Sequence, residues 1–189
     1  MVILAAGVLL FALLHGVAAV PHYKSYVKSR TGERWYGPVF GLASLVALGV
    51  IVLGWRSSDF VAVYEPRLWG WYVNYLLTFI GFLCLGIFLF RGSYRQRLRF
   101  PMGIATVFWA VGHLFANGDL ASLILFGGLL VGGAAHMATA VANGIRPTPE
   151  VRTGHNGLSL TFGAAHYGIM TQLHPSVIGV PIFAISKAG

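Results

Sequence analysis

The chain has 189 residues, of which 57% are hydrophobic and only 10% are charged. A soluble domain of this length cannot bury so much apolar surface, so the composition predicts a multi-pass membrane protein. The formal net charge of +8 would suggest nucleic acid as a partner of a soluble protein. Here the basic residues fall in short segments between apolar runs, so we expect membrane lipids as partners and no nucleic acid. The single cysteine, Cys84, excludes an internal disulfide framework.

Five apolar runs predict an all-α, multi-pass transmembrane helical bundle. Each run is long enough, or nearly so, to cross a hydrocarbon core of about 30 Å. The first run lacks a basic region before it and has one after it, which favours a retained helix over a cleaved signal peptide. The fourth run is short, and "ANGD" at 116–119 predicts a tight turn in which Asp119 caps the fifth helix. The runs cover residues 2–20, 36–55, 68–90, 102–116 and 120–142.

The C-terminal part is predicted in two alternative ways. The Gly and Pro content of residues 146–157 predicts a loop, which we expect on the cytoplasmic side, and an apolar segment follows at 158–189. This segment is either a sixth span broken at Pro175 or an interfacial helix followed by an apolar tail. The bundle therefore has five to six spans, and residues 1–145 form its main part in both cases.

The basic residues predict the orientation of the chain. Most of the Lys and Arg residues lie in the segments 21–35, 91–100 and 143–157, whereas the connections 56–67 and 117–119 carry no basic excess. Basic and non-basic connections thus alternate along the chain, as the positive-inside rule expects. We predict that the N-terminus lies outside and that the three basic segments face the cytoplasm.

Histidines interrupt the apolar runs, although an ionisable side chain within a bilayer is costly and is a functional candidate by default. His15, His113, His136 and His166 come from four different helices. Counted at about 1.5 Å per residue, they fall in a slab that a single cofactor could bridge. Each histidine taken alone is also explained as an interhelical hydrogen-bond partner. Neutral imidazoles without carboxylates suit haem iron or copper better than a hard cation.

Two helical faces carry these histidines. Gly128, Gly132 and His136 recur every four residues, so a groove of small residues leads to His136. His166, Met170 and His174 share a face of the last segment, which is either a ligand stripe or ordinary core packing. We expect His174 itself to lie at the interface and to be solvated.

The order of motifs resembles the NnrU family of bacterial membrane proteins, which also includes the plant and algal ζ-carotene isomerase. The resemblance is carried by "GERWYGPVFGLASLVALGVIVLGW" at 32–55, by the basic "LRFPMG" at 98–103 and by "FWAVGHLFANGDLASLILFGG" at 108–128. It covers about residues 1–142 and implies a multi-pass protein of the bacterial inner membrane. One departure is Phe100, which stands where the family has the histidine of "R-H-P-M".

The isomerase branch of the family implies a b-type haem held by two histidines. Carried over residue by residue, His113 matches the histidine of the "W-x-x-x-H-L" motif and His15 matches the histidine of the first span, so these two are the candidate axial metal ligands. His136 matches a further histidine of that branch and is a third cofactor-binding candidate. Neither candidate axial ligand depends on the histidine that Phe100 replaces.

The resemblance leaves the reaction open. The NnrU branch is associated with denitrification and nitric oxide metabolism, and the isomerase branch with cis-trans isomerisation of a polyene such as ζ-carotene, a hydrophobic small molecule. A non-catalytic accessory subunit of a larger membrane complex is an alternative, with the histidines as interhelical contacts. An isoprenylcysteine-type membrane methyltransferase is a further alternative, but Phe100 counts against it. The sequence therefore does not decide whether the protein is an enzyme.

Overall fold

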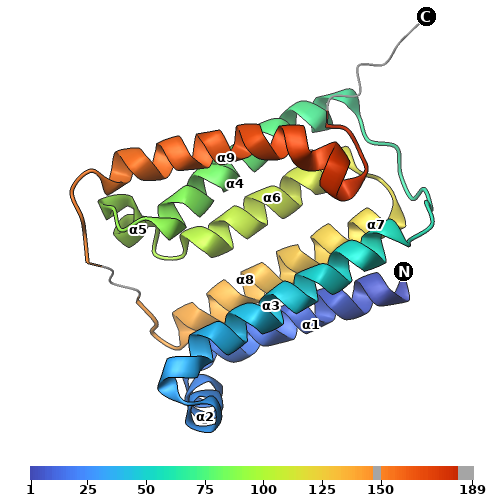
Figure 1. The fold of residues 1–189 in the computed structure, drawn as a ribbon. Helices are drawn as coiled ribbons and strands as arrows, with labels where there is room; N and C mark the ends of the chain where they lie inside the picture. Colours follow the sequence, from blue (N-terminus) through green and yellow to red (C-terminus); the bar gives the residue numbers. More distant parts are fainter. Residues whose placement is uncertain (147–149, 183–189) are drawn as a thin grey trace, which may run out of the picture.

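The computed structural model describes residues 1–146 and 150–182, and helices make up most of these residues (Figure 1). Within the described ranges the only β pairing is an isolated bridge between Ala62 and Asp119. The helices are α1 Val2–Ala19, α2 Pro21–Thr31, α3 Glu33–Arg56, α4 Leu68–Leu89, α5 Ser93–Leu98, α6 Pro101–Ala116, α7 Leu120–Ser122, the π-helix η1 Leu123–Gly127, α8 Gly128–Ala142 and α9 His155–Ile178.

The helix lengths and composition confirm the predicted all-α, multi-pass membrane class. Among the described residues, four helices are long and apolar enough to cross a membrane: α1, α3, α4 and the continuous helix Leu120–Ala142, which joins α7, η1 and α8. The fourth predicted run is the shorter apolar helix α6. The number of spans and the side on which the N-terminus lies stay predictions.

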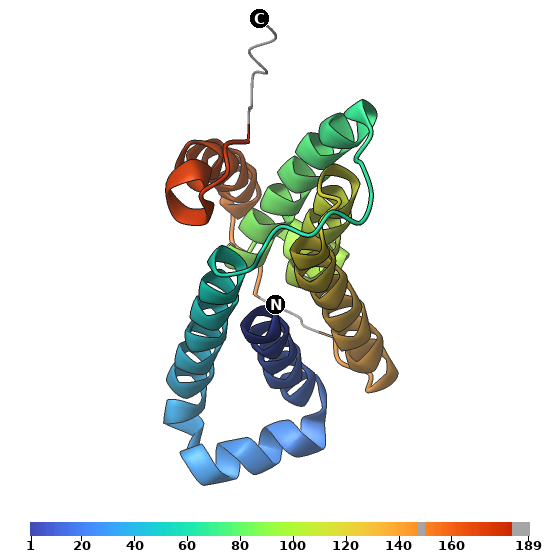
Figure 2. The same cartoon turned by 90° about the vertical axis from the view of Figure 1, so that its right-hand side faces the viewer.

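The helices form two layers (Figures 1 and 2). In one layer α4 packs between α6 and α9, and in the other α1 packs against α3 and α8. The two layers are joined by contacts between α6 and α8. These helices lie side by side because only a short turn separates α6 from the continuous helix that includes α8. Large apolar side chains are exposed over the outer helix faces, for example Leu42, Leu45 and Val131. Such a surface is expected where helices face lipid.

Close helix contacts are made at glycines. A methyl group at Gly54 of α3 would collide with the backbone of Leu4 of α1, and one at Gly86 of α4 would collide with the carbonyl oxygen of Ser159 of α9. Small residues allow membrane helices to approach this closely, which increases van der Waals contact between them. Some of the glycines of the chain therefore allow close helix packing in each layer.

The helices give the bundle two distinct ends. We call the end that holds Met1, the connection 57–67 and residue 119 the Asp119 end, and the opposite end the α2 end. The predicted groove on α8 is confirmed, because Gly128 lies against Val8 and Gly132 against Ala12 of α1. These contacts show that α1 and α8 run in the same direction. A core of buried apolar side chains lies toward the Asp119 end: Leu4, Val8, Ile51, Ala110, Ala121, Leu125, Phe126 and Leu129.

Two segments differ from simple expectations. The basic segment after α1 is not a loop, because residues 21–31 form the exposed helix α2, which crosses the end of the bundle (Figure 2). The C-terminal helix α9 continues through Pro175 to Ile178 and lies alongside α4. It is not among the helices that are apolar enough to span by composition. Residues 147–149 of the predicted loop and 183–189 of the predicted apolar segment lie outside the described residues.

Candidate functional site

His113 lies one turn before the end of α6, between aromatic rings. Its Nδ1 is 2.8 Å from the carbonyl oxygen of Trp109. Its ring stacks on Phe126, with the ring centroids 4.4 Å apart and the planes at 28°, and lies 5.1 Å from the Trp109 ring. In the neutral tautomer that this geometry favours, Nδ1–H donates to the carbonyl and Nε2 carries a lone pair. None of the hydrogen bonds among the described residues uses this Nε2.

A π-helix positions the ring that covers His113. Residues Leu123–Gly127 form η1 within the otherwise α-helical segment, and Phe126 belongs to it. The Phe126 ring also meets the Trp109 ring edge-on, with the centroids 5.0 Å apart. Single π turns inside α-helices occur frequently at functional sites. Here the π turn brings an aromatic side chain onto the face of an imidazole.

Polar groups at the Asp119 end hold the last turn of α6. The side-chain amide of Asn117 donates to the carbonyl oxygen of His113 at 2.9 Å. The Tyr64 hydroxyl donates to the carbonyl oxygens of Leu114 and Asn117. Burial raises the pKa of Tyr64, and the nearby Asp119 carboxylate raises it further, so the phenol stays protonated as a donor. These bonds satisfy carbonyls that a helix end would otherwise leave unpaired.

The "ANGD" turn is fixed by its backbone. Asp119 caps the next helix, as predicted, by accepting from the backbone N–H of Ser122 at 2.9 Å and from its hydroxyl at 2.6 Å. The backbone N–H groups of residues 63 and 64 both donate to the carbonyl of Gly118. A side chain at Gly118 would collide with the carbonyl of Tyr64, which requires glycine there. The end of α6 is therefore clamped to the connection 57–67.

His15 and His136 form a second group. The Nδ1 of His136 on α8 is 2.9 Å from the carbonyl oxygen of His15 on α1. The Nδ1 of His15 is 2.9 Å from the carbonyl oxygen of Phe11, and its ring stacks on the Phe11 ring at 4.1 Å. The ring of Phe40 from α3 meets His15 edge-on. The structure thus brings together two of the three predicted cofactor-binding histidines.

His113 does not lie with this pair. Gly103 of α6 lies against the side chain of Met137, and His136 immediately precedes Met137, so the pair is level with the start of α6. From residue 103 to 113 the helix rises about 15 Å. No contact or hydrogen bond among the described residues joins His113 to His15. Their pairing as axial ligands stays a prediction.

The two histidines of the candidate ligand stripe, His166 and His174, lie on α9. The His166 ring stacks on Phe162 at 5.5 Å and lies 5.3 Å from Phe82 of α4, so it serves the packing of α9 on α4. His174 is half-buried, with its Nδ1 2.6 Å from the carbonyl oxygen of Val180. This hydrogen bond lies at the exposed surface, and the expectation that His174 is solvated stays a prediction.

The family model described as NnrU protein matches residues 3–182. The chain belongs to the NnrU family. No curated protein and no solved structure matches it. The match to the NnrU model continues beyond residue 142, where the resemblance seen in the sequence ends, and includes α9 with His166 and His174. Helix α9 is therefore part of the NnrU domain and is not an appended tail.

The donor set of this NnrU chain fits axial ligation of a haem iron. His15, His113, His136 and His174 each place Nδ1 at a backbone carbonyl, which leaves Nε2 as the lone-pair nitrogen. A hydrogen bond from the other ring nitrogen fixes the tautomer of a metal-bound imidazole and raises its basicity. In the described parts of the chain, no three His, Cys, Asp or Glu side chains gather as a metal site would need.

Proposed function

We propose that this NnrU family member is a membrane protein that binds b-type haem through His113. The observation that carries the proposal is the setting of this imidazole. Its Nδ1 faces the Trp109 carbonyl, its ring lies on Phe126, and its Nε2 has no partner among the described hydrogen bonds. Bound haem would supply an iron that can engage a polyene double bond or nitric oxide.

The residues around His113 would prepare it for this role. The Trp109 carbonyl holds the Nδ1 proton, so Nε2 stays available as the ligand atom. The Phe126 ring stacks on one face of the imidazole, and the Trp109 ring lies tilted beside it. Asn117 fixes the backbone of His113 through its side-chain amide. A rigidly held ligand nitrogen is what a haem site requires.

We further propose that the protein acts in the bacterial inner membrane with the α2 end toward the cytoplasm. Helices α2 and α5 carry basic residues without acidic ones and lie at this end (Figure 1). At the Asp119 end, Arg56 and Arg67 are balanced by Asp59 and Glu65. The positive-inside rule places the basic end in the cytoplasm. A polyene or nitric oxide would then reach the haem site from the surrounding lipid.

An absorption spectrum tests the haem proposal. The wild type is purified in detergent from cells supplied with haem, and oxidised and dithionite-reduced spectra are recorded. We expect a b-type haem spectrum that is lost or strongly changed in His113→Ala. His22→Ala is the matched control, because His22 lies exposed on α2, and its spectrum should equal that of the wild type. A colourless wild type from haem-replete cells would overturn the proposal and leave an accessory role in a membrane complex.

Addition of ligands separates the two proposed reactions. Nitric oxide added to the reduced protein should shift the Soret band if the iron can open a coordination position. A cis polyene in the same detergent should be converted to its trans isomer if the protein is an isomerase, as followed by chromatography. Conversion that persists in His113→Ala would contradict a role for the haem in the isomerisation.

A further inference from the structure

We propose that His174 of α9 provides the second axial imidazole, opposite His113. This assignment rests on the proposed function, because it names the partner ligand of the same haem. It differs from the pairing that the sequence predicts, in which His15 is the second ligand. Three features of the structure support it, and they come from different parts of the chain.

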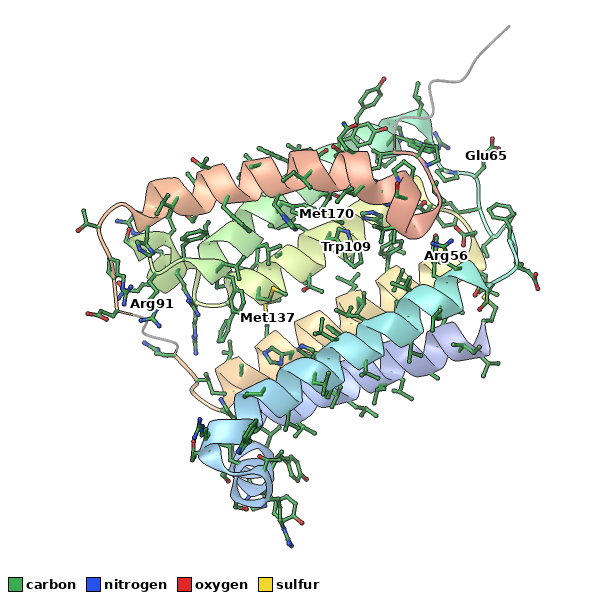
Figure 3. All side chains as sticks on the ribbon, in the orientation of Figure 1. Arg56, Glu65, Arg91, Trp109, Met137 and Met170 are labelled. Carbon is green, nitrogen blue, oxygen red and sulfur yellow. The ribbon has the colours of Figure 1, made fainter. Side chains whose placement is uncertain are left out.

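The first feature is the inward face of α9. Ser159 and Gly163 of α9 pack against the backbone of α4. One turn further, Tyr167 meets the rings of Phe79 and Phe82 on α4. Residues three and four positions apart lie on the same side of a helix, so this face continues through Met170 to His174. In Figure 3, Met170 lies on the side of α9 that faces α6 and Trp109.

The second feature is the way in which the end of α9 is tied to the Asp119 end. The Arg56 side chain, at the end of α3, donates to the carbonyl oxygen of Val177 at 3.2 Å. The Tyr75 hydroxyl, near the start of α4, donates to the carbonyl oxygen of Ile182 at 3.2 Å. Residues 174–182 are thus fixed to both layers of the bundle, at the end where His113 lies. His15 lies near the opposite end.

The third feature is the chemistry of the two imidazoles. His113 lies in the last turn of α6 and His174 in the last turns of α9, and both helices end at the Asp119 end of the bundle. Each places Nδ1 at a backbone carbonyl, of Trp109 and Val180 respectively. In each, Nε2 is therefore the lone-pair nitrogen, and no described hydrogen bond occupies it. Two imidazoles from different helices would form the ligand set of a low-spin haem b.

Spin state tests the assignment without any activity measurement. Spectra and electron paramagnetic resonance are recorded on the haem-loaded wild type and on His174→Ala, His15→Ala and His166→Ala. We expect a low-spin wild type and conversion of His174→Ala to high spin, with low spin restored by added imidazole. His15→Ala should stay low-spin. His166→Ala is the matched control on the same helix and should also stay low-spin, because His166 packs between Phe162 and Phe82.

Two results would overturn the assignment while leaving the haem proposal intact. One is a His174→Ala variant that stays low-spin. The other is loss of the low-spin signal in His15→Ala, which would instead support the pairing of His15 with His113. A colourless wild type would overturn both proposals together. Circular dichroism of each variant shows whether it has kept its helices, and the recovery by imidazole identifies a lost ligand rather than a lost fold.

A second measurement needs no haem. In a Cys84→Ala background, His113→Cys is combined either with His174→Cys or with His15→Cys, and a short bifunctional thiol reagent is added. Mass spectrometry of the linked peptides should find a link between positions 113 and 174 and none between 113 and 15. The reverse result would refute the facing arrangement, whether or not haem binds.

Discussion

The contact between α9 and α4 predicts opposite effects for two glycine substitutions on one helix. In Gly163→Ala, the added methyl would lie 2.6 Å from the carbonyl oxygen of Phe82 and 2.8 Å from the Cα of Leu83. In Gly168→Ala, the methyl would meet nothing within 4 Å. Both glycines lie inside α9 (His155–Ile178), so the gain in helix propensity is the same in the two variants.

The magnitudes follow from these distances. Ordinary contact begins at 3.4 Å, so in Gly163→Ala the backbones of α9 and α4 must separate by close to 1 Å. Overpacking of this kind costs about 1–3 kcal/mol, and the change from glycine to alanine within a helix recovers about 1 kcal/mol. We therefore expect Gly163→Ala to be neutral to destabilising by about 2 kcal/mol, and Gly168→Ala to be stabilising by up to about 1 kcal/mol.

Thermal unfolding in detergent measures the difference. For a chain of this size about 1 kcal/mol corresponds to about 2–4 °C in Tm, so the Tm of Gly163→Ala should lie about 2–12 °C below that of Gly168→Ala. Equal Tm values, or a lower Tm for Gly168→Ala, would refute the packing of α9 on α4. Because the same packing positions His174, the haem-loaded Gly163→Ala variant should also show a partial high-spin signal.

Two substitutions at the Asp119 end test the clamp on α6. Tyr64→Phe removes the hydroxyl that donates to two carbonyls of the last turn, so it should cost about 1–2 kcal/mol of unfolding free energy, whereas Tyr72→Phe, whose ring is exposed, should leave the Tm unchanged. Asp119→Ala removes the acceptor for the backbone N–H of Ser122 and should cost about 1 kcal/mol of unfolding free energy. Asp119→Asn keeps an acceptor and should cost clearly less. Equal losses of stability in the two variants would contradict the cap.

The helical fold could be predicted because the apolar runs are long and their breaks are polar. A run of about 20 apolar residues has few alternatives to a membrane helix, and the runs at 2–20 and 68–90 agree with α1 and α4 to within one or two residues. The helix α2 could not be found this way, because a basic segment without an apolar face gives no periodic signal. The π turn at 123–127 likewise leaves no signal in the sequence.

The site was harder to predict than the fold, because the positions of residues along separate helices depend on how the helices are staggered. Counting residues from the predicted loops places His15 and His113 in one slab. The contacts of Gly103 with Met137, and of His136 with His15, show that α6 carries His113 well beyond that level. His174 was expected to be solvated because it was placed at the interface. Helix α9 continues through Pro175 to Ile178, so His174 lies within the helix and not beside a break.

The string "HLFANGD" combines two roles that the sequence alone does not separate. The side-chain amide of Asn117 donates a hydrogen bond to the backbone carbonyl of His113, and the carboxylate of Asp119 accepts one from the backbone N–H of Ser122. Gly118 is required because the backbone of Tyr64 approaches it closely. Each of these polar or small residues is accounted for by the shape of the turn. Among the described hydrogen bonds, neither the Nε2 of His113 nor the side-chain oxygen of Asn117 has a partner. The turn therefore accounts for the side-chain amide N–H of Asn117 and the carboxylate of Asp119, and it leaves the imidazole Nε2 to be explained by the proposed metal ligation.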